Sequence, residues 1–128
     1  MTERKEIVAE GAPRGTGAYS QAIRACDFVY ISGQGPLDPV TLEVIGTTVE
    51  EQTEVTLRNV EAIAVAAGGS LRDAVKVGVF LANISDFPAF NATYERILAW
   101  SPRPARTTVA CELRNILVEI DAVLHLPR

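Results

Sequence analysis

The sequence predicts an α+β fold, in which one mixed β-sheet of about six strands carries two helices on one face. Short segments rich in β-branched residues recur along the chain and have the length of strands. Two longer segments show helical periodicity instead. At 128 residues, without an internal repeat or a linker, the chain is expected to form a single domain over residues 1–128.

The N-terminal strands are predicted from short apolar runs that are separated by glycine-rich segments. Residues 7–9 form a short strand, and a flexible loop with three glycines follows at 11–17. Residues 18–25 and 28–32 then pair as a hairpin around a tight turn. The loop lacks the Gly-Lys-Ser/Thr ending of a phosphate-binding loop, which argues against a nucleotide site. The small residues at 32–35 allow a ligand or another chain to approach the backbone closely.

Both helices are predicted from amphipathic periodicity and from their end signals. Residues 48–67 place apolar and small side chains on one face and charged side chains mostly on the other. Acids cluster at the start of this helix, where its dipole favours them, and Gly68 and Gly69 end it. The second helix covers residues 86–100, with Asp86 as its expected cap and proline in its first turn.

The remaining strands fall at residues 74–82, 106–111 and 116–124. The first of them is nearly apolar on both faces, which predicts a central position in the sheet. Its expected core face consists of Val75, Val77, Val79 and Leu81. In the last strand the even positions are apolar, whereas the odd positions include Glu119 and Asp121.

Two helices can cover only one face of such a sheet, and the other face also carries apolar residues. That second face therefore needs a partner. The simplest partner is another copy of the chain, so the sequence predicts an obligate oligomer.

Composition excludes several classes of function. The net charge is −4 and no basic run exceeds Arg4-Lys5, which argues against binding to nucleic acid or anionic lipid. The chain has two cysteines, Cys26 and Cys111, without metal-ligand spacing, and one histidine, His125, so we expect no metal site. No signal peptide and no apolar run of membrane-spanning length is apparent. The chain is predicted to be cytoplasmic and not bound to membranes.

Arg106 and Glu119 are the first candidates for chemistry. Glu119 lies on the mixed face of its strand, so it is either exposed at the rim of the sheet or held in a partly buried site. A guanidinium and a carboxylate near one cleft could bind and process a small carboxylic acid. The alternative is that both residues are ordinary surface charges on an edge hairpin.

Four sequence blocks, in this order, resemble the Rid/YjgF (RidA) family of imine deaminases over roughly residues 7–124. The blocks are residues 18–23 (AYSQAI), 29–34 (VYISGQ), 86–94 (DFPAFNATY), and 104–106 (PAR) with 117–120 (LVEI). The resemblance implies a chorismate-mutase-like (YjgF-like) fold and a homotrimer with clefts between subunits. It also implies a hydrolase acting on C=N bonds, which converts 2-enamino and 2-imino acids to 2-oxo acids and ammonia without a cofactor. Such imines escape from pyridoxal-phosphate enzymes.

The resemblance also assigns roles to individual residues. Arg106 matches the arginine that clamps the substrate carboxylate, and Glu119 matches the glutamate that orients the attacking water. Tyr19 and Ser32 match a polar pair that lines the pocket. The structural alternatives are a surface charge for Arg106, an ion pair for Glu119 and satisfied hydroxyl groups for the polar pair.

Three further residues are expected on the substrate side. From the resemblance, Gly33 and Thr108 are expected to offer backbone N–H groups to the carboxylate. Asn91 matches a recurrent asparagine on the second helix, although it could only cap or bridge.

The chain departs from the family pattern at three places. The common Gly-Pro-Tyr-Ser is Gly-Ala-Tyr-Ser at residues 17–20, and Thr108 replaces a frequent cysteine, which removes any thiol role there. The turn at residues 113–115 is also short. Its length leaves two registers open, which place Arg106 and Glu119 either on one face of the sheet or on opposite faces. In the second case the two could still meet across a subunit interface.

Three other functions compete with housekeeping imine deamination. One is a non-catalytic module that holds small carboxylates in the same cleft. Another is a pathway-specific deaminase that acts on a ring-cleavage amino acid, as an aminomuconate deaminase would. The third is an RNA-cleaving translation inhibitor, against which the acidic charge and the lack of a basic stripe count.

Overall fold

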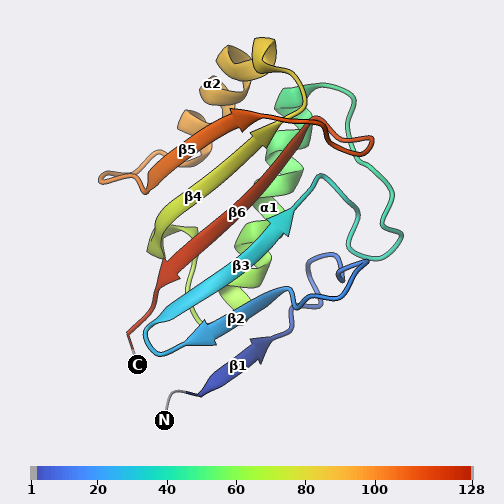
Figure 1. Ribbon diagram of the computed structural model, residues 1–128. Helices are drawn as coiled ribbons and strands as arrows, with labels where there is room; N and C mark the ends of the chain where they lie inside the picture. Colours follow the sequence, from blue (N-terminus) through green and yellow to red (C-terminus); the bar gives the residue numbers. More distant parts are fainter. Residues whose placement is uncertain (1–2, 128) are drawn as a thin grey trace.

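The protein, described by a computed structural model over residues 3–127, folds around one six-stranded mixed sheet (Figure 1). The order of strands across the sheet is β1-β2-β3-β6-β4-β5. The strands are β1 (Arg4–Ile7), β2 (Ala22–Ala25), β3 (Phe28–Gln34), β4 (Ala74–Leu81), β5 (Ala105–Ala110) and β6 (Val118–His125). The helices are α1 (Val49–Ala66) and α2 (Phe87–Ile97), and two short 3-10 turns are η1 (Leu71–Asp73) and η2 (Ile84–Asp86).

The two helices lie behind the sheet in Figure 1, and its front face carries no helix. Only β4 and β5 run parallel, and all other neighbours are antiparallel. The predicted α+β class, the six strands and the one-sided helix layer are therefore confirmed. We call the uncovered side the open face.

The hydrophobic core lies between the sheet and α1. Val118, Ile120, Ala122 and Leu124 are buried along β6, as the alternation of apolar residues predicted. Val60 and Ile63 of α1 are fully buried against the sheet. Burying a side chain of this size contributes roughly 1.5–3 kcal/mol, so this shared layer holds the helix on the sheet.

Helix α1 begins and ends where its sequence signals predicted. Thr48 accepts a hydrogen bond from the backbone N of Glu51, and the Glu51 side chain accepts from the backbone of Thr48 in return. Backbone N–H donors of Thr47 and Thr48 hold the pKa of the exposed Glu51 carboxyl below its ordinary value. At the other end, Gly68 has a φ of 98°, a left-handed conformation that stops the helix.

Two N-terminal strands were predicted with wrong bounds. The first strand covers Arg4–Ile7 rather than residues 7–9, and the second begins only at Ala22 rather than at residue 18. The physical reason for the second difference is Gln21. Its buried side chain accepts a hydrogen bond from the backbone N of Ala9 and donates to backbone carbonyls of the preceding loop. That loop therefore folds around Gln21 and keeps residues 18–21 out of the sheet.

The predictions for β4 and for the cap of α2 also need correction. Strand β4 is one strand from the edge, and a register shift between Ala74 and Lys76 leaves Val75 45% exposed instead of buried. Asp86 precedes α2 but makes no capping hydrogen bond with its side chain. The second helix also ends at Ile97, before the predicted residue 100.

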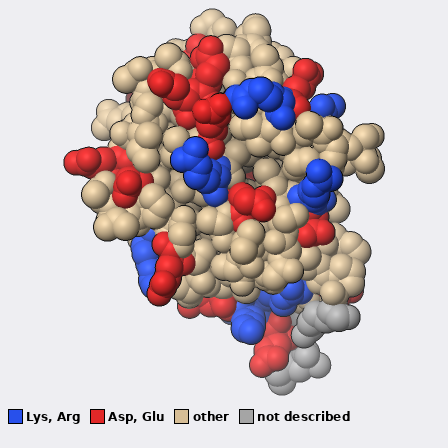
Figure 2. Space-filling view, turned by 180° about the vertical axis from the view of Figure 1, so that it is seen from behind, with Lys and Arg blue, Asp and Glu red and all other residues tan. Residues whose placement is uncertain are grey.

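The open face of the sheet is rich in exposed apolar side chains. Phe28, Tyr30 and Val109 are each more than a third exposed there. The helix-covered face differs, because acidic and basic side chains intermingle on it without a continuous basic stripe (Figure 2). Among residues 3–127, no helix combines the length and apolar character needed to cross a bilayer.

Candidate active site

Four of the predicted site residues line one hollow on the open side of the sheet. Tyr19, Ser32, Gly33 and Glu119 surround a volume of about 400 Å³. Ser32 and Gly33 come from β3, and Glu119 comes from the neighbouring strand β6. We call this group the carboxylate half-site.

Gly33 allows the Glu119 side chain to lie against the backbone of β3. A Cβ atom at residue 33 would lie 3.0 Å from Cδ of Glu119 and still closer to one carboxylate oxygen. The glycine sits at an irregularity in the pairing of β3 with β6, between Ile31 and Gln34. This local shape places an ionisable carboxyl at the floor of the hollow.

Burial raises the pKa of the Glu119 carboxyl above its ordinary value, and the nearby Asp121 carboxylate raises it further. Asp121 lies two positions along β6 on the same face, packed over Gly78 of β4. Sequence reasoning gave Asp121 no role, although the period of two places it on the face of Glu119. A carboxyl with a raised pKa is suited to take up and return a proton near neutral pH.

The hydroxyl groups of Ser32 and Tyr19 differ in whether they can donate a hydrogen bond to a ligand. Ser32 Oγ donates a 2.7 Å hydrogen bond to the carbonyl of Ser20, so it can only accept from a ligand. The Tyr19 hydroxyl accepts a long hydrogen bond from Thr16 N at 3.4 Å, and its proton remains available. The Tyr19 ring is 53% exposed and packs on Gly15 of the glycine-rich loop. That loop thereby holds the ring at the mouth of the hollow.

Arg106 lies elsewhere, on the helix-facing side of β5. Its guanidinium carbon is 4.7 Å from the ring centroid of Tyr94 and 5.6 Å from those of Phe87 and Phe90 on α2. Among the described residues, the ion pair that the structure shows joins Arg96 and Glu54, and no described carboxylate pairs with Arg106. The guanidinium is held by aromatic faces and keeps its donors for another group.

Arg106 shares a second hollow of about 360 Å³ with Asn91, Tyr94, Arg103 and neighbouring residues. We call this the guanidinium half-site. Arg103 donates from Nε to the carbonyl of Leu98 at 2.6 Å, which fixes its position. Burial raises the pKa of the Tyr94 hydroxyl, and the charges of Arg106 and Arg103 oppose that shift. Sequence reasoning gave neither Tyr94 nor Arg103 a role in this site. Arg103 stands between Pro102 and Pro104, three residues before Arg106, and this position was the feature of the sequence that could have identified it.

The two half-sites lie on opposite sides of the same sheet. Arg106 pairs with Val77 and Glu119 pairs with Phe80, so an odd number of positions on β4 separates them. The register is thus the one that sends Arg106 toward the helices and Glu119 toward the open face. Thr108 shares the side of Arg106, and its buried hydroxyl has no partner among the described residues. One chain therefore does not place Arg106 and Glu119 in one cleft.

The remaining predicted residue, Asn91, extends from α2 into the guanidinium half-site, where its amide donates to Glu95 at 3.4 Å. Over residues 3–127 no group of three or more His, Cys, Asp or Glu side chains is arranged to hold a metal ion. Both cysteines are exposed and unbridged.

The chain is similar in sequence and in structure to known proteins. Residues 9–126 match the family model described as Endoribonuclease L-PSP. A RutC family protein of Saccharolobus solfataricus is 43% identical over 122 residues, covering 93% of this chain and 96% of the relative. The 2-iminobutanoate/2-iminopropanoate deaminase of Dermatophagoides farinae is 35% identical over 126 residues, covering 97% and 98%. The crystal structure of RidA from an Antarctic Psychrobacter species superposes with a TM-score of 0.90 at 39% identity, covering 95% and 99%.

The fold and the two half-sites therefore define a protein of the YjgF/RidA fold, with a six-stranded sheet and one helix layer. More specifically, the chain belongs to the Rid/YjgF family, the one whose model is described as Endoribonuclease L-PSP. Some relatives carry the name of an imine deaminase, while others are named only as RutC family proteins.

Proposed function

We propose that this protein hydrolyses reactive 2-imino and 2-enamino acids to 2-oxo acids and ammonia, as a homotrimer whose clefts lie between subunits. The observation that carries the proposal is the environment of the Arg106 side chain. Its guanidinium is held against three aromatic rings, lines an open hollow and has no carboxylate partner among the described residues. A planar fork of this kind matches the carboxylate of an amino-acid-derived substrate.

The chemistry follows from the other half-site. Water adds to the C=N carbon of the imine, and Glu119 accepts a proton from that water as the C–O bond forms. The proton then passes to nitrogen, which gives a carbinolamine. Glu119 next takes the proton of the new hydroxyl group and returns it to the nitrogen, so that the C=O bond forms as the C–N bond breaks, and ammonia leaves with a 2-oxo acid as the second product. The Tyr19 hydroxyl donates to the water or to the imine nitrogen, and Ser32 accepts. A raised pKa suits Glu119 to both proton transfers.

The two half-sites are completed between copies of the chain. Arg106 and Glu119 face opposite sides of one sheet, so a single substrate reaches both only if a second chain supplies one of them. The open face offers the apolar surface that such an assembly buries, with Phe28, Tyr30 and Val109 exposed on it. Strand β5, which carries Arg106, is one of the two edge strands and is accessible to a neighbouring copy.

The rival functions make different predictions for the same pocket. A non-catalytic module would bind 2-oxo acids through Arg106 and release no ammonia from imines. A pathway-specific deaminase would release ammonia from one aminomuconate-like substrate only. A panel of substrates therefore separates all three.

The decisive experiment is an assay in which an amino-acid oxidase generates imines from a panel of amino acids. The disappearance of each imine is followed with and without the protein, and ammonia release is measured in parallel. We expect faster hydrolysis for several small side chains, unchanged by a chelator. Binding of 2-oxo acids without any acceleration would contradict the proposal and favour the binding module.

A further inference from the structure

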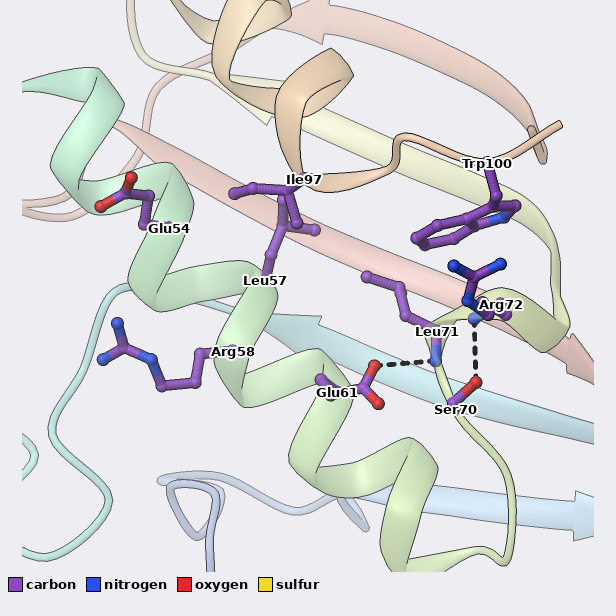
Figure 3. Close-up of a pocket in the computed structure, with 9 residues that line it drawn as sticks. All are labelled: Glu54, Leu57, Arg58, Glu61, Ser70, Leu71, Arg72, Ile97 and Trp100. Atoms are coloured by element: carbon purple, nitrogen blue, oxygen red, sulfur yellow. Dashed lines mark hydrogen bonds between the residues drawn. The ribbon is translucent and has the colours of Figure 1, made fainter.

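A third cavity, separate from both half-sites, lies between α1, η1 and the end of α2 (Figure 3). Its volume is about 320 Å³, at the small end of the range of roughly 300–1,000 Å³ that is usual for ligand sites. Leu57, Leu71 and Ile97 point into it, and the edge of the Trp100 ring closes one end. No residue proposed for imine hydrolysis lines this cavity.

The rim of the cavity carries two carboxylates, Glu54 and Glu61, and only Glu61 can accept a further hydrogen bond or ion pair from a ligand. Glu54 is engaged in an ion pair with Arg96 on α2. Glu61 accepts a 2.8 Å hydrogen bond from the backbone N of Leu71 through one carboxylate oxygen only. No described residue donates a hydrogen bond to its other oxygen. Glu61 is thus positioned by the fold and retains an acceptor.

The rim also holds a guanidinium without an acidic partner. Arg72 lies against the face of Trp100, with its guanidinium carbon 4.9 Å from the ring centroid. Among the described residues no carboxylate lies within ion-pair distance of Arg72, and its side chain donates no hydrogen bond. Stacking on the indole fixes the plane of the guanidinium and leaves its N–H edge available. In Figure 3 Arg72 and Glu61 lie on either side of Leu71.

We propose that this cavity binds a free α-amino acid with an apolar side chain. The ammonium group pairs with Glu61, the carboxylate with Arg72, and the aliphatic side chain packs on Leu57, Leu71 and Ile97. A simple carboxylic acid would leave the Glu61 charge without a partner, and a simple amine would do the same to Arg72. Only a zwitterion satisfies both groups while it fills the apolar floor.

The position of the cavity keeps it open in the proposed assembly. Its lining residues belong to α1, η1 and the end of α2 and the turn after it, on the helix side of the sheet, whereas the proposed association uses the open face on the other side. Figure 1 shows that the helices lie on one side of the sheet only. Binding here is therefore independent of the proposed imine site, and each can be tested while the other is disabled.

Trp100 provides the readout, because it is the only tryptophan in the chain and contacts Arg72. Leucine is titrated while tryptophan emission is recorded, with calorimetry in parallel. Three analogues each lack one feature: 4-methylpentanoate has no ammonium, 3-methylbutylamine has no carboxylate and serine has no apolar side chain. We expect saturable binding of leucine and at least tenfold weaker binding of every analogue.

Matched variants locate the site. Glu61→Gln keeps an acceptor for the backbone of Leu71 but loses the charge, and Arg72→Gln removes the guanidinium. Each should weaken leucine binding at least tenfold. The control is Glu50→Gln on α1, which does not line the cavity. It should change the affinity less than twofold.

Arg106→Gln separates this cavity from the proposed imine site, and it should leave leucine binding unchanged. Absence of saturable binding by both fluorescence and calorimetry would overturn the proposal. Equal affinity for 4-methylpentanoate or 3-methylbutylamine would overturn it as well. So would loss of leucine binding in Arg106→Gln but not in Glu61→Gln.

Discussion

The side chain of Glu119 lies directly against the backbone of Gly33 on the adjacent strand. A methyl group at residue 33 would approach Cδ of Glu119 to 3.0 Å and its carboxylate oxygen more closely. Contacts this short do not occur between real side chains, so any larger residue must displace the carboxylate. The sequence of β3 therefore controls the position of the proposed proton carrier on β6.

Gly33→Ala is expected to reduce kcat for imine hydrolysis by about tenfold or more, since a displacement of about 1 Å can cost up to about a hundredfold. The fold should persist, because Gly33 is partly exposed and has no positive φ. Gly11→Ala is the matched control, since its added methyl would meet Ala62 at an ordinary 3.5 Å. Equal activity in the two variants would show that the position of Glu119 is not critical.

Glu119→Gln should lower kcat strongly and leave substrate binding nearly unchanged, because the amide keeps the shape but carries no transferable proton. Its effect on stability has the opposite sign. A raised pKa means that the folded chain holds the proton more tightly than the unfolded chain, so stability falls as pH rises through that window. The neutral glutamine avoids this loss, and Tm at pH 7 should not decrease. A collapse of substrate binding would instead make Glu119 a structural or electrostatic anchor.

Asp121→Asn tests the electrostatic coupling along β6. Burial is the main cause of the raised pKa of Glu119, and the Asp121 charge is the second. Removing that charge should lower the pKa of Glu119 and move the acidic limb of the kcat profile to lower pH. The limb should stay above the ordinary range of a glutamate, because burial remains. An unmoved profile would show that Asp121 does not influence the reacting carboxyl.

Arg106 variants should lose kcat/KM through lost carboxylate binding. Two charge-assisted hydrogen bonds, each worth roughly 1.5–3 kcal/mol, predict a total loss of roughly 3–6 kcal/mol, or on the order of a hundredfold to ten-thousandfold in kcat/KM. Arg106→Lys should recover part of this, since it keeps the charge but not the planar fork. The packing of Arg106 on three rings makes Arg106→Gln a better test than Arg106→Ala, because glutamine retains part of the aliphatic stem. Near-normal hydrolysis by Arg106→Gln would refute the carboxylate clamp.

Much of this fold could be predicted from local patterns. The alternation in β6 identified its buried side chains, and the acids at the start of α1, together with Gly68 and Gly69 after it, identified its ends. The errors at β2 and β4 have non-local causes. Gln21 reaches residues up to 12 positions away through its side chain, and the bulge at Val75 depends on pairing with a strand far along the chain. No local pattern contains that information.

The candidate site also combines features that the sequence predicted with features that depend on contacts between distant parts of the chain. The resemblance identified Arg106 and Glu119, but the length of a turn left their relative faces open. Their relative faces follow from the pairing of both strands with β4, where Arg106 lies opposite Val77 and Glu119 lies opposite Phe80. The aromatic rings around Arg106 come from α2, which meets β5 only in the folded chain. The helical pattern predicted α2, but not which residues its rings pack against.

The exposed apolar side chains of the open face predict self-association. Light scattering at micromolar concentration should give about three times the chain mass of 13.8 kDa. Tyr30→Lys, which places a charge on the open face, should lower this mass without unfolding the chain. Because Tyr30 lies within β3, a circular dichroism spectrum should accompany the measurement to show that the variant is folded. A wild-type monomer under these conditions would exclude the proposed clefts.

A mixture of two inactive variants tests directly whether one cleft draws on two chains. Arg106→Gln lacks the guanidinium and Glu119→Gln lacks the carboxyl, and the two positions lie on opposite sides of each sheet. If a cleft takes Arg106 from one copy and Glu119 from the next, random mixing in equal amounts gives both intact with a probability of about one half times one half. Subunit exchange, by mild denaturation and refolding, should then restore about a quarter of wild-type activity. Each variant carried through the same exchange alone should stay inactive, which controls for the treatment itself. Mass spectrometry of the intact assembly should show mixed trimers. Mixed trimers without restored activity would mean that both groups act from one chain, and the proposed intersubunit site would be wrong.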